Sequence, residues 1–289
     1  MEITKPTFIE LKNKNLAVEL CTLGASIYRI RFHDVDMLVT PINKDDFSKN
    51  NIYFGKTIGR VAGRINLKDK RYSLQYNDNE LSLHGGKDGL STKEFSYKKK
   101  ENSVEFTYLS EDGEAGYPGN LKIKVIYELL EDGLKVSYSC SVDKPCLLAL
   151  TNHAFFCLGE KTTNELVLRI NADRYIYVDG NLKPIESRVS PFKFEGETFD
   201  DYDDIDNYFY LKDNLISLNG SKYGVQITSS FSGVQIYTDH YDDEIITQCS
   251  DMTCYRGVAI EPEDDQQDRK ELLPNEKYER YIEYRFIEL

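Results

Sequence analysis

The chain has 289 residues, and its 49 acidic side chains outnumber its 36 basic ones, so its formal net charge is −13 with neutral histidines. That charge argues against a nucleic-acid-binding surface or a site for anionic membranes, because both need patches of Lys and Arg. Hydrophobic residues make up 40% of the chain and aromatic residues 12%, which excludes a disordered chain and favours a folded core. A neutral small molecule fits this composition better than a phosphorylated ligand does.

The chain carries no sign of export or of membrane insertion. Its first residues lack a basic segment followed by an apolar one, so no secretory signal is expected. No run approaches the roughly 18–20 apolar residues of a membrane helix. The six cysteines are scattered, and Cys249 and Cys254 have no nearby His pair to complete a zinc site. These features predict a cytoplasmic protein with reduced thiols.

Hydrophobic residues alternate with polar ones with a period of two along most of the chain. A short helix is expected around residues 44–50. Strands are expected, in chain order, at Val104–Tyr108, Leu121–Leu129, Leu134–Val142, Leu166–Ile170, Tyr175–Val178, Val225–Thr228 and Val234–Thr238. Glu131-Asp-Gly133 separates two of them as a turn.

Many short strands joined by turns predict an all-β fold of packed antiparallel sheets, a sandwich or a barrel. No Pro-, Gly- or Ser-rich linker and no repeat divides the chain, so residues 1–289 are predicted to form a single domain. The acidic segment Glu195–Asp206 is the one marked shift in composition, and it is expected to be a solvated loop.

Two of the four histidines have unusual neighbours. His153 follows Thr151 and Asn152 inside an apolar stretch, and polar groups there must be hydrogen-bonded or line a cavity. His84 precedes Gly85 and Gly86, which let the backbone approach a ligand closely. A satisfied core histidine and a plain turn are the respective alternatives.

Charged residues give two further candidates. Arg60 and Arg64 flank small residues, so a guanidinium could reach a ligand hydroxyl; two surface arginines are the alternative. Glu261 follows the apolar run Gly257–Ile260, where it could act as a general base at the end of a buried strand or belong to an acidic turn.

Taken together and in this order, these segments resemble the aldose 1-epimerase (galactose mutarotase) family over nearly the whole chain. The matching segments are Thr22-Leu-Gly-Ala-Ser26, Gly59-Arg-Val-Ala-Gly-Arg-Ile65, Leu83-His-Gly-Gly86, Gly116-Tyr-Pro-Gly-Asn-Leu121, Thr151-Asn-His-Ala-Phe-Phe-Cys-Leu158, Ile205-Asp-Asn-Tyr-Phe209, Val234-Gln-Ile-Tyr-Thr238, Gly257-Val-Ala-Ile-Glu-Pro262 and Leu273-Pro-Asn-Glu-Lys-Tyr278. The resemblance implies a large antiparallel β-sandwich of the galactose mutarotase type. It also implies interconversion of the α and β anomers of a hexose such as galactose or glucose, without a cofactor or a metal.

The resemblance assigns a role to each matching site residue. Glu261 would be the general base at the C1 hydroxyl, and His153 the general acid at the ring oxygen. The substrate-binding residues would be Arg64, His84, Asp206 and Asn152. An acid and a base on opposite sides of a ring are what anomer exchange requires. The expected partner is therefore a small-molecule aldose, with neither nucleic acid nor membrane, and the protein is expected to be a monomer or a homodimer.

The chain departs from the family pattern near these residues. Gly63 stands where the family commonly has Asn, Phe155 and Cys157 replace two polar groups, and Asn207 replaces His. Further departures are Pro184-Ile-Glu186 for P-T-G and Gln267-Asp-Arg269 for P-D-A. None removes the acid or the base, but they leave the preferred sugar open.

Three other functions remain possible from the sequence. The first is a carbohydrate-binding β-sandwich without catalysis, and the second an epimerase acting on a modified or phosphorylated hexose. The third is a glycoside hydrolase with Asp206 and Glu261 as paired carboxylates. Because the chain has no Trp, Phe155 or Phe156 could stack on a sugar ring, although both also suit a core position.

Overall fold

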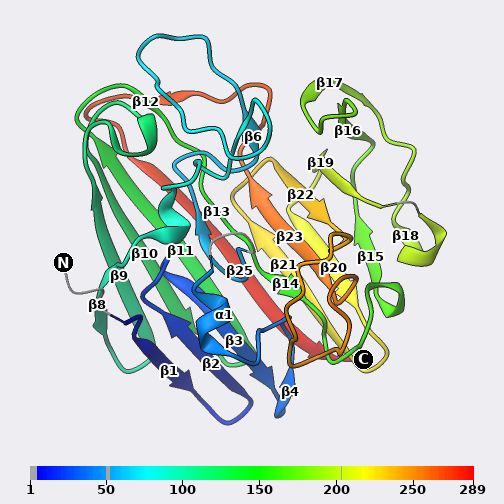
Figure 1. Cartoon of the computed structure of the whole chain (residues 1–289). Helices are drawn as coiled ribbons and strands as arrows, with labels where there is room; N and C mark the ends of the chain where they lie inside the picture. The colour runs from blue at the N-terminus through cyan, green and yellow to red at the C-terminus, as the bar shows by residue number, and fades with distance from the viewer. Residues whose placement is uncertain (1–4, 50–52, 203) are drawn as a thin grey trace.

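The largest element of the computed structural model, which describes residues 5–49, 53–202 and 204–289, is a nine-stranded antiparallel sheet (Figure 1). Its strands, from one edge to the other, are β18 (Glu195–Thr198), β15 (Val167–Ile170), β20 (Leu215–Asn219), β21 (Tyr223–Ser229), β25 (Tyr278–Glu288), β11 (Gly133–Val142), β10 (Leu121–Leu129), β9 (Ser103–Ser110) and β8 (Ser96–Lys99). In β10 every odd-numbered residue is buried, because a period of two directs alternate side chains to one face.

A six-stranded sheet packs against the large one and carries most of the site described below. Its order is β14 (Phe155–Phe156), β23 (Val258–Glu263), β22 (Gly233–Tyr237), β19 (Asp206–Tyr210), β16 (Arg174–Val178) and β17 (Pro184–Val189). The ring of Phe156 contacts that of Tyr284 in β25, with centroids 5.4 Å apart, so the two sheets share one core. All six residues of β23 are buried.

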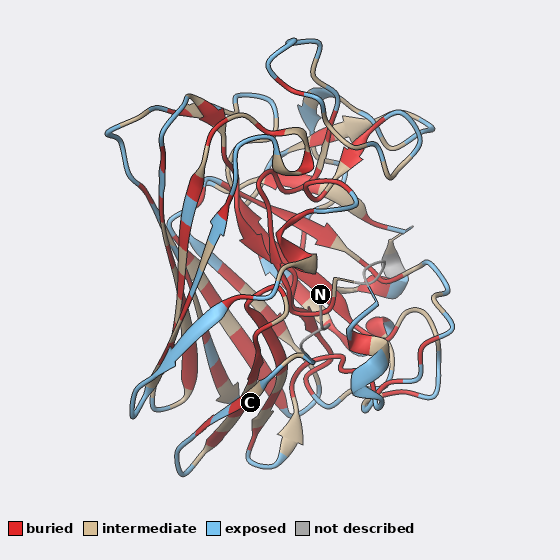
Figure 2. Cartoon of the chain, turned by 60° about the vertical axis from the view of Figure 1, so that its left-hand side comes forward, coloured by how far each residue is buried: buried red, intermediate tan, exposed pale blue. Residues whose placement is uncertain are grey.

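A four-stranded sheet completes the sandwich. It consists of β1 (Phe8–Lys12), β2 (Leu16–Cys21), β3 (Ser26–Phe32) and β4 (Val35–Asp36). Phe32 packs against Phe286 of the large sheet, with ring centroids 6.0 Å apart. Figure 2 shows the buried residues gathered between the sheets, with exposed ones along the outer strands and the loops.

Short elements link these layers. Three two-stranded pairs are β5 (Thr57–Ile58) with β13 (Thr151–Asn152), β6 (Arg64–Ile65) with β7 (Ser82–Leu83), and β12 (Cys146–Leu147) with β24 (Glu271–Leu272). Single 3₁₀ turns occur at Leu90–Thr92, Glu114–Gly116, Thr163–Glu165 and Phe199–Asp201. The helix α1 spans Lys44–Phe47, so no helix in the described part of the chain is long enough to cross a membrane.

The predicted strands and the all-β class are confirmed, and so is the short helix, whose predicted end at residue 50 lies outside the described residues. The acidic segment differs from the expected loop. Glu195–Thr198 forms the edge strand β18, paired with β15, and Asp206 opens β19. An edge strand accepts charged side chains because one of its sides faces solvent.

Candidate active site

A cavity of about 180 Å³ lies between the six-stranded sheet and the loops around β6 and β7. Five residues predicted from the sequence line it, namely Arg64, His84, His153, Asp206 and Glu261. They come from β6, the turn after β7, the segment between β13 and β14, β19 and β23, so the fold gathers side chains from five parts of the chain.

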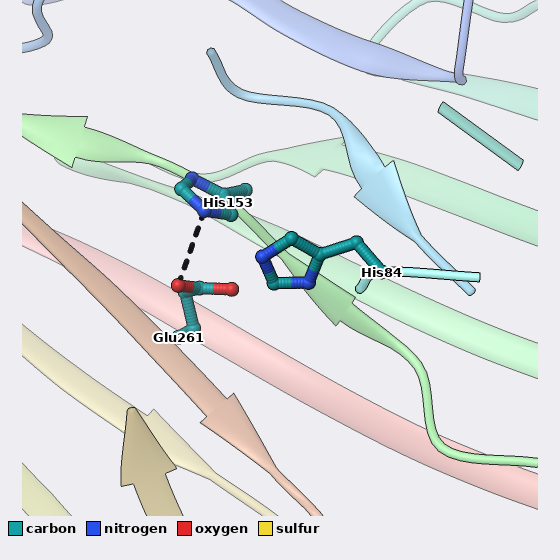
Figure 3. A group of neighbouring side chains, drawn as sticks. All are labelled: His84, His153 and Glu261. Atoms are coloured by element: carbon teal, nitrogen blue, oxygen red, sulfur yellow. Dashed lines mark ion pairs between the residues drawn. The ribbon is translucent and has the colours of Figure 1, made fainter. Parts of the chain in front are cut away.

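Glu261 and His153 contact each other in the lining of the cavity (Figure 3). The Nε2 atom of His153 lies 3.3 Å from Oε1 of Glu261, and both side chains are almost fully buried. Burial raises the pKa of Glu261 well above its ordinary value, and the nearby Glu263 and Asp206 carboxylates raise it further. Burial lowers the pKa of His153 to about 3. Burial therefore favours a neutral carboxyl beside a neutral imidazole over an ion pair.

Two buried polar atoms of this pair lack a partner. Nδ1 of His153 and Oε2 of Glu261 make no hydrogen bond with any described residue. Buried polar atoms are normally paired, because leaving one unpaired costs about 1–3 kcal/mol. Both residues line the cavity, and Oε2 of Glu261 has no described partner that would compete with a polar ligand there.

His84 is held in one tautomer by the backbone. The N–H of Gly63 donates to Nδ1 of His84 at 3.2 Å, so in the neutral ring the proton is on Nε2. Burial lowers the pKa of His84, and the neighbouring His153 and Arg64 lower it further. Its ring meets that of His153 edge to face, with centroids 5.1 Å apart. A neutral ring with Nε2–H serves as a hydrogen-bond donor.

The backbone conformation of the turn that contains His84 requires the two glycines that follow it. His84 itself has a φ of +54°, and Gly85 has a φ of +88°. A Cβ on Gly85 would lie 2.0 Å from the carbonyl oxygen of Gly59. The glycines are needed for this close backbone approach, which agrees with the signal in the sequence.

Arg64 and Asp206 are already paired in the cavity wall. Nη1 of Arg64 donates to Oδ2 of Asp206 at 3.0 Å, and its Nε donates to Asp78 at 2.6 Å. The other oxygen of Asp206 accepts a 2.6 Å hydrogen bond from Gln235. These contacts fix both charged groups in position before a ligand arrives.

The structure places two of the candidate residues, Asn152 and Arg60, away from the cavity. Asn152 does not line the cavity: its fully buried amide donates to the carbonyl oxygen of Gly55 at 2.8 Å and to Tyr127. Adjacent residues of an extended chain face opposite sides, so His153 points into the cavity and Asn152 into the core. Asn152 therefore supports the segment that carries His153 rather than contacting substrate.

Arg60 is neither a ligand contact nor a surface arginine. It is 2% exposed, and its guanidinium donates to the hydroxyl and carbonyl of Ser110 and to the carbonyl of Gly119. It ties the segment before β6 to the end of β9.

The sequence did not reveal several lining residues. Gln235 lies directly opposite Glu261 in the β22–β23 pair, so both face the same side; a glutamine in an otherwise apolar strand was the available signal. The hairpin β16–β17 adds an apolar wall of Ile176, Val178, Leu182 and Pro184. Of the two candidate stacking residues, Phe155 lines the cavity, whereas Phe156 is in the core.

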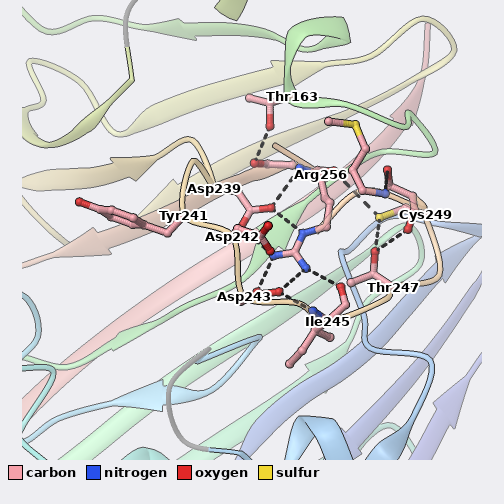
Figure 4. A network of polar contacts seen from close by, with 12 residues as sticks. Thr163, Asp239, Tyr241, Asp242, Asp243, Ile245, Thr247, Cys249 and Arg256 are labelled. Atoms are coloured by element: carbon pink, nitrogen blue, oxygen red, sulfur yellow. Dashed lines mark hydrogen bonds and ion pairs between the residues drawn. The ribbon is translucent and has the colours of Figure 1, made fainter. Parts of the chain in front are cut away.

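The rim of the cavity is braced by Arg256 (Figure 4). This fully buried guanidinium makes two hydrogen bonds to each of two carboxylates, those of Asp239 and Asp243, at 2.6–3.0 Å. Asp239, Asp243 and the intervening Tyr241 line the cavity. Paired guanidinium–carboxylate contacts of this kind hold a loop in a single geometry.

The sequence model of the family described as aldose 1-epimerase matches residues 7–285. The chain belongs to the aldose 1-epimerase family. Galactose mutarotase of Homo sapiens is 29% identical over 268 residues, covering 81% of this chain and 78% of that protein. Galactose mutarotase of Sus scrofa is 31% identical over 204 residues, covering 66% of this chain but 59% of that protein, less than two thirds of its length.

A solved structure extends the similarity to the whole fold. The GalM/aldose epimerase homologue from C. elegans superposes with a TM-score of 0.90 at 26% identity, covering 98% of this chain and 99% of that one. The predicted resemblance to aldose 1-epimerases and the sandwich of the galactose mutarotase type are confirmed.

One group in this member of the aldose 1-epimerase family has the composition of a metal site. Potential ligand atoms of His84, His153 and Glu261 lie within 4.8 Å of one another. The hydrogen bond from Gly63 engages Nδ1 of His84 and places the proton on Nε2, which leaves the neutral ring no free lone pair for an ion. The tautomer suits a hydrogen-bond donor to an organic ligand better than a metal ligand.

Proposed function

We propose that the protein is an aldose 1-epimerase that interconverts the α and β anomers of a hexose such as galactose or glucose. The observation that carries the proposal is the buried contact between His153 and Glu261, with one unpaired polar atom on each side chain. Membership of the aldose 1-epimerase family supports the same reaction.

The reaction needs one proton removed and one supplied. Glu261 takes the proton of the C1 hydroxyl while His153 protonates the ring oxygen, and the C1–O5 bond breaks to leave a free aldehyde. Rotation about C1–C2 turns the other face of the aldehyde to the attacking hydroxyl. On closure Glu261 returns its proton to the carbonyl oxygen and His153 recovers one from the hydroxyl, so no proton is gained or lost.

The burial of Glu261 and His153 favours both proton transfers. A carboxylate whose pKa is raised is a stronger base, and an imidazolium whose pKa is lowered is a stronger acid. The 3.3 Å contact lets the neutral pair convert to the ionic pair by moving one proton from Glu261 to His153. His84, Arg64 and Asp206 orient the sugar.

The cavity gives less support to the other functions. Asp206 is engaged by Arg64 and Gln235, so it is not a free partner for Glu261 in glycoside hydrolysis. Arg64 already contacts two carboxylates, and Asp239 and Asp243 share the single guanidinium of Arg256, so no free cation faces the cavity from these groups, which disfavours a phosphorylated hexose.

The test is the optical relaxation of freshly dissolved α-galactose and α-glucose. The protein is expected to accelerate the change for at least one of them, and Glu261→Gln and His153→Ala are expected to abolish the acceleration. Glu261→Gln should keep much of the affinity for the sugar, because an amide still forms hydrogen bonds. Equal rates for wild type and Glu261→Gln would exclude this mechanism, and sugar binding without acceleration would favour a carbohydrate-binding protein.

A further inference from the structure

The segment after β23 contributes a second amide to the cavity wall. Gln266 lines the cavity three residues beyond Glu263, the last residue of β23. A Cβ on Gly63 would lie 2.8 Å from Nε2 of Gln266 and 3.0 Å from Nη2 of Arg269. The Gln266 amide and the Arg269 guanidinium therefore occupy the space that a side chain at position 63 would take.

A chain of hydrogen bonds fixes which way this amide faces. Nε2 of Gln235 donates to Asp206, and Oε1 of Gln235 accepts from Nε2 of Gln266 at 3.2 Å. Nε2 of Gln266 also donates to Oε1 of the buried Glu263. Burial raises the pKa of Glu263 to about 7. An ionised carboxylate only accepts, so Asp206 at one end and the ionised form of Glu263 at the other require the amide nitrogens to face them.

This orientation leaves one acceptor for a ligand. Two hydrogen bonds use both hydrogens of the Gln266 amide, and no described residue donates to its Oε1 atom. A carbonyl acceptor in the cavity wall matches a sugar hydroxyl, which can donate. Two aldoses that differ in the configuration of one hydroxyl present that donor in different directions, so a fixed acceptor distinguishes them.

We propose that Gln266 is a further specificity-determining residue, whose amide oxygen accepts a hydrogen bond from an aldose hydroxyl, and that Glu263 is a positioning residue acting through it. This inference rests on the proposed function, because it takes an aldose as the occupant of the cavity. The hydrogen bonds of Gln266 run to Gln235 and Glu263 and to neither Glu261 nor His153, so Gln266 affects which sugar is bound rather than how the ring opens.

The test compares Gln266→Ala with Gln267→Ala, its exposed neighbour with the same side chain. Gln266→Ala is expected to raise KM for the preferred sugar about fivefold, the typical effect of one lost hydrogen bond. It should change the ratio of kcat/KM between galactose and glucose and leave kcat within about twofold. Gln267→Ala should resemble wild type. An unchanged KM and ratio in Gln266→Ala overturns the assignment.

A double-mutant cycle tests the role of Glu263. Glu263→Gln should raise KM in the wild-type background and have no further effect in Gln266→Ala, because Glu263 acts through Gln266. Equal effects of Glu263→Gln in both backgrounds overturn that role. A purely structural function would lower the thermal midpoint without this dependence on Gln266.

Calorimetric titration with galactose and glucose separates the two proposals. If wild type binds a sugar but does not accelerate its mutarotation, the proposed reaction fails, and weaker binding by Gln266→Ala still supports the contact. Equal affinity of wild type and Gln266→Ala overturns the contact while leaving the reaction standing. A wild-type protein that binds neither sugar overturns both.

Discussion

At the scale of single residues, the order in which Glu261 and His153 ionise is the reverse of the ordinary one. Free side chains would place glutamate near pH 4.3 and histidine near pH 6.5. Here burial raises the pKa of Glu261 and lowers that of His153 to about 3. Between these limits the pair holds a constant number of protons, so the fraction in the ionic form does not depend on pH.

The pH dependence of kcat/KM should reflect this order of ionisation. We expect kcat/KM to be level from about pH 5 to beyond pH 6.5. It should fall on the alkaline side only when Glu261 loses its proton in the presence of neutral His153. Polarimetric rates measured from about pH 3.5 to 9.5 check this. An alkaline limb near the ordinary histidine value would show that burial does not set the two pKa values.

The burial of Glu261 also lowers the free energy of unfolding as the pH rises. Its folded-state pKa is raised above the unfolded value, so stability is greatest below the unfolded pKa and declines as the pH rises toward the folded one. Glu261→Gln removes this ionisation, and its free energy of unfolding should exceed that of wild type by about 1–3 kcal/mol at pH 8.

Urea unfolding of both proteins at pH 5 and pH 8 measures the difference. The difference between the unfolding free energies of Glu261→Gln and wild type should be larger at pH 8, because unfolding at higher pH allows the Glu261 carboxyl of wild type to ionise more fully. A difference that shrinks as the pH rises would contradict the raised pKa. Glu101→Gln, at an exposed glutamate outside the cavity, provides the control variant.

At the scale of elements, the cavity rim depends on Arg256. Lys in its place keeps the charge but cannot make paired contacts to Asp239 and Asp243 at once. Arg256→Lys should lower the free energy of unfolding by about 2–4 kcal/mol. It should also raise KM severalfold with a smaller effect on kcat, because the loop with Tyr241 shifts while Glu261 and His153 stay in place.

The matched control is Arg285→Lys on the exposed face of β25, which should behave as wild type. Thermal unfolding and steady-state kinetics of both variants provide the measurements. Full stability in Arg256→Lys would mean that the rim does not depend on the paired contacts.

Strands were predictable as elements, but their partners were not. Alternation in Leu121–Leu129 gave both the strand and its buried face. The pairing that places Gln235 opposite Glu261 is a tertiary contact, and no local pattern encodes it. The misassignment of Asn152 has a similar origin, since a motif names residues without saying which of two neighbours faces the cavity.

At the scale of the whole molecule, the family pattern named the residues predicted as acid and base and four other site residues, and all but Asn152 line one cavity. It could not locate Gln266, because that residue lies just before the departing segment Gln267–Arg269 and its amide occupies the space left open at Gly63. The single domain, the cytoplasmic location and the oligomeric state stay predictions.

The net charge of −13 makes a separate prediction about substrates. The electrostatic field of the protein does not act on a neutral hexose. A hexose 6-phosphate is negatively charged, so the net charge of the protein and the carboxylates of the cavity repel it. Raising the salt from about 0.01 to 1 M shortens the Debye length from about 30 to 3 Å. We therefore expect kcat/KM for galactose to change less than about twofold over that range, because screening does not act on an uncharged substrate.

Galactose 6-phosphate should have a kcat/KM at least about tenfold lower than galactose at low salt, and the gap should narrow as salt screens the repulsion. Exchange between anomers, followed by nuclear magnetic resonance, measures both sugars under the same conditions. If the phosphorylated sugar were the better substrate at low salt, a local cationic site would have to override the field of the whole molecule. Arg64, held between Asp78 and Asp206, is not free to provide one.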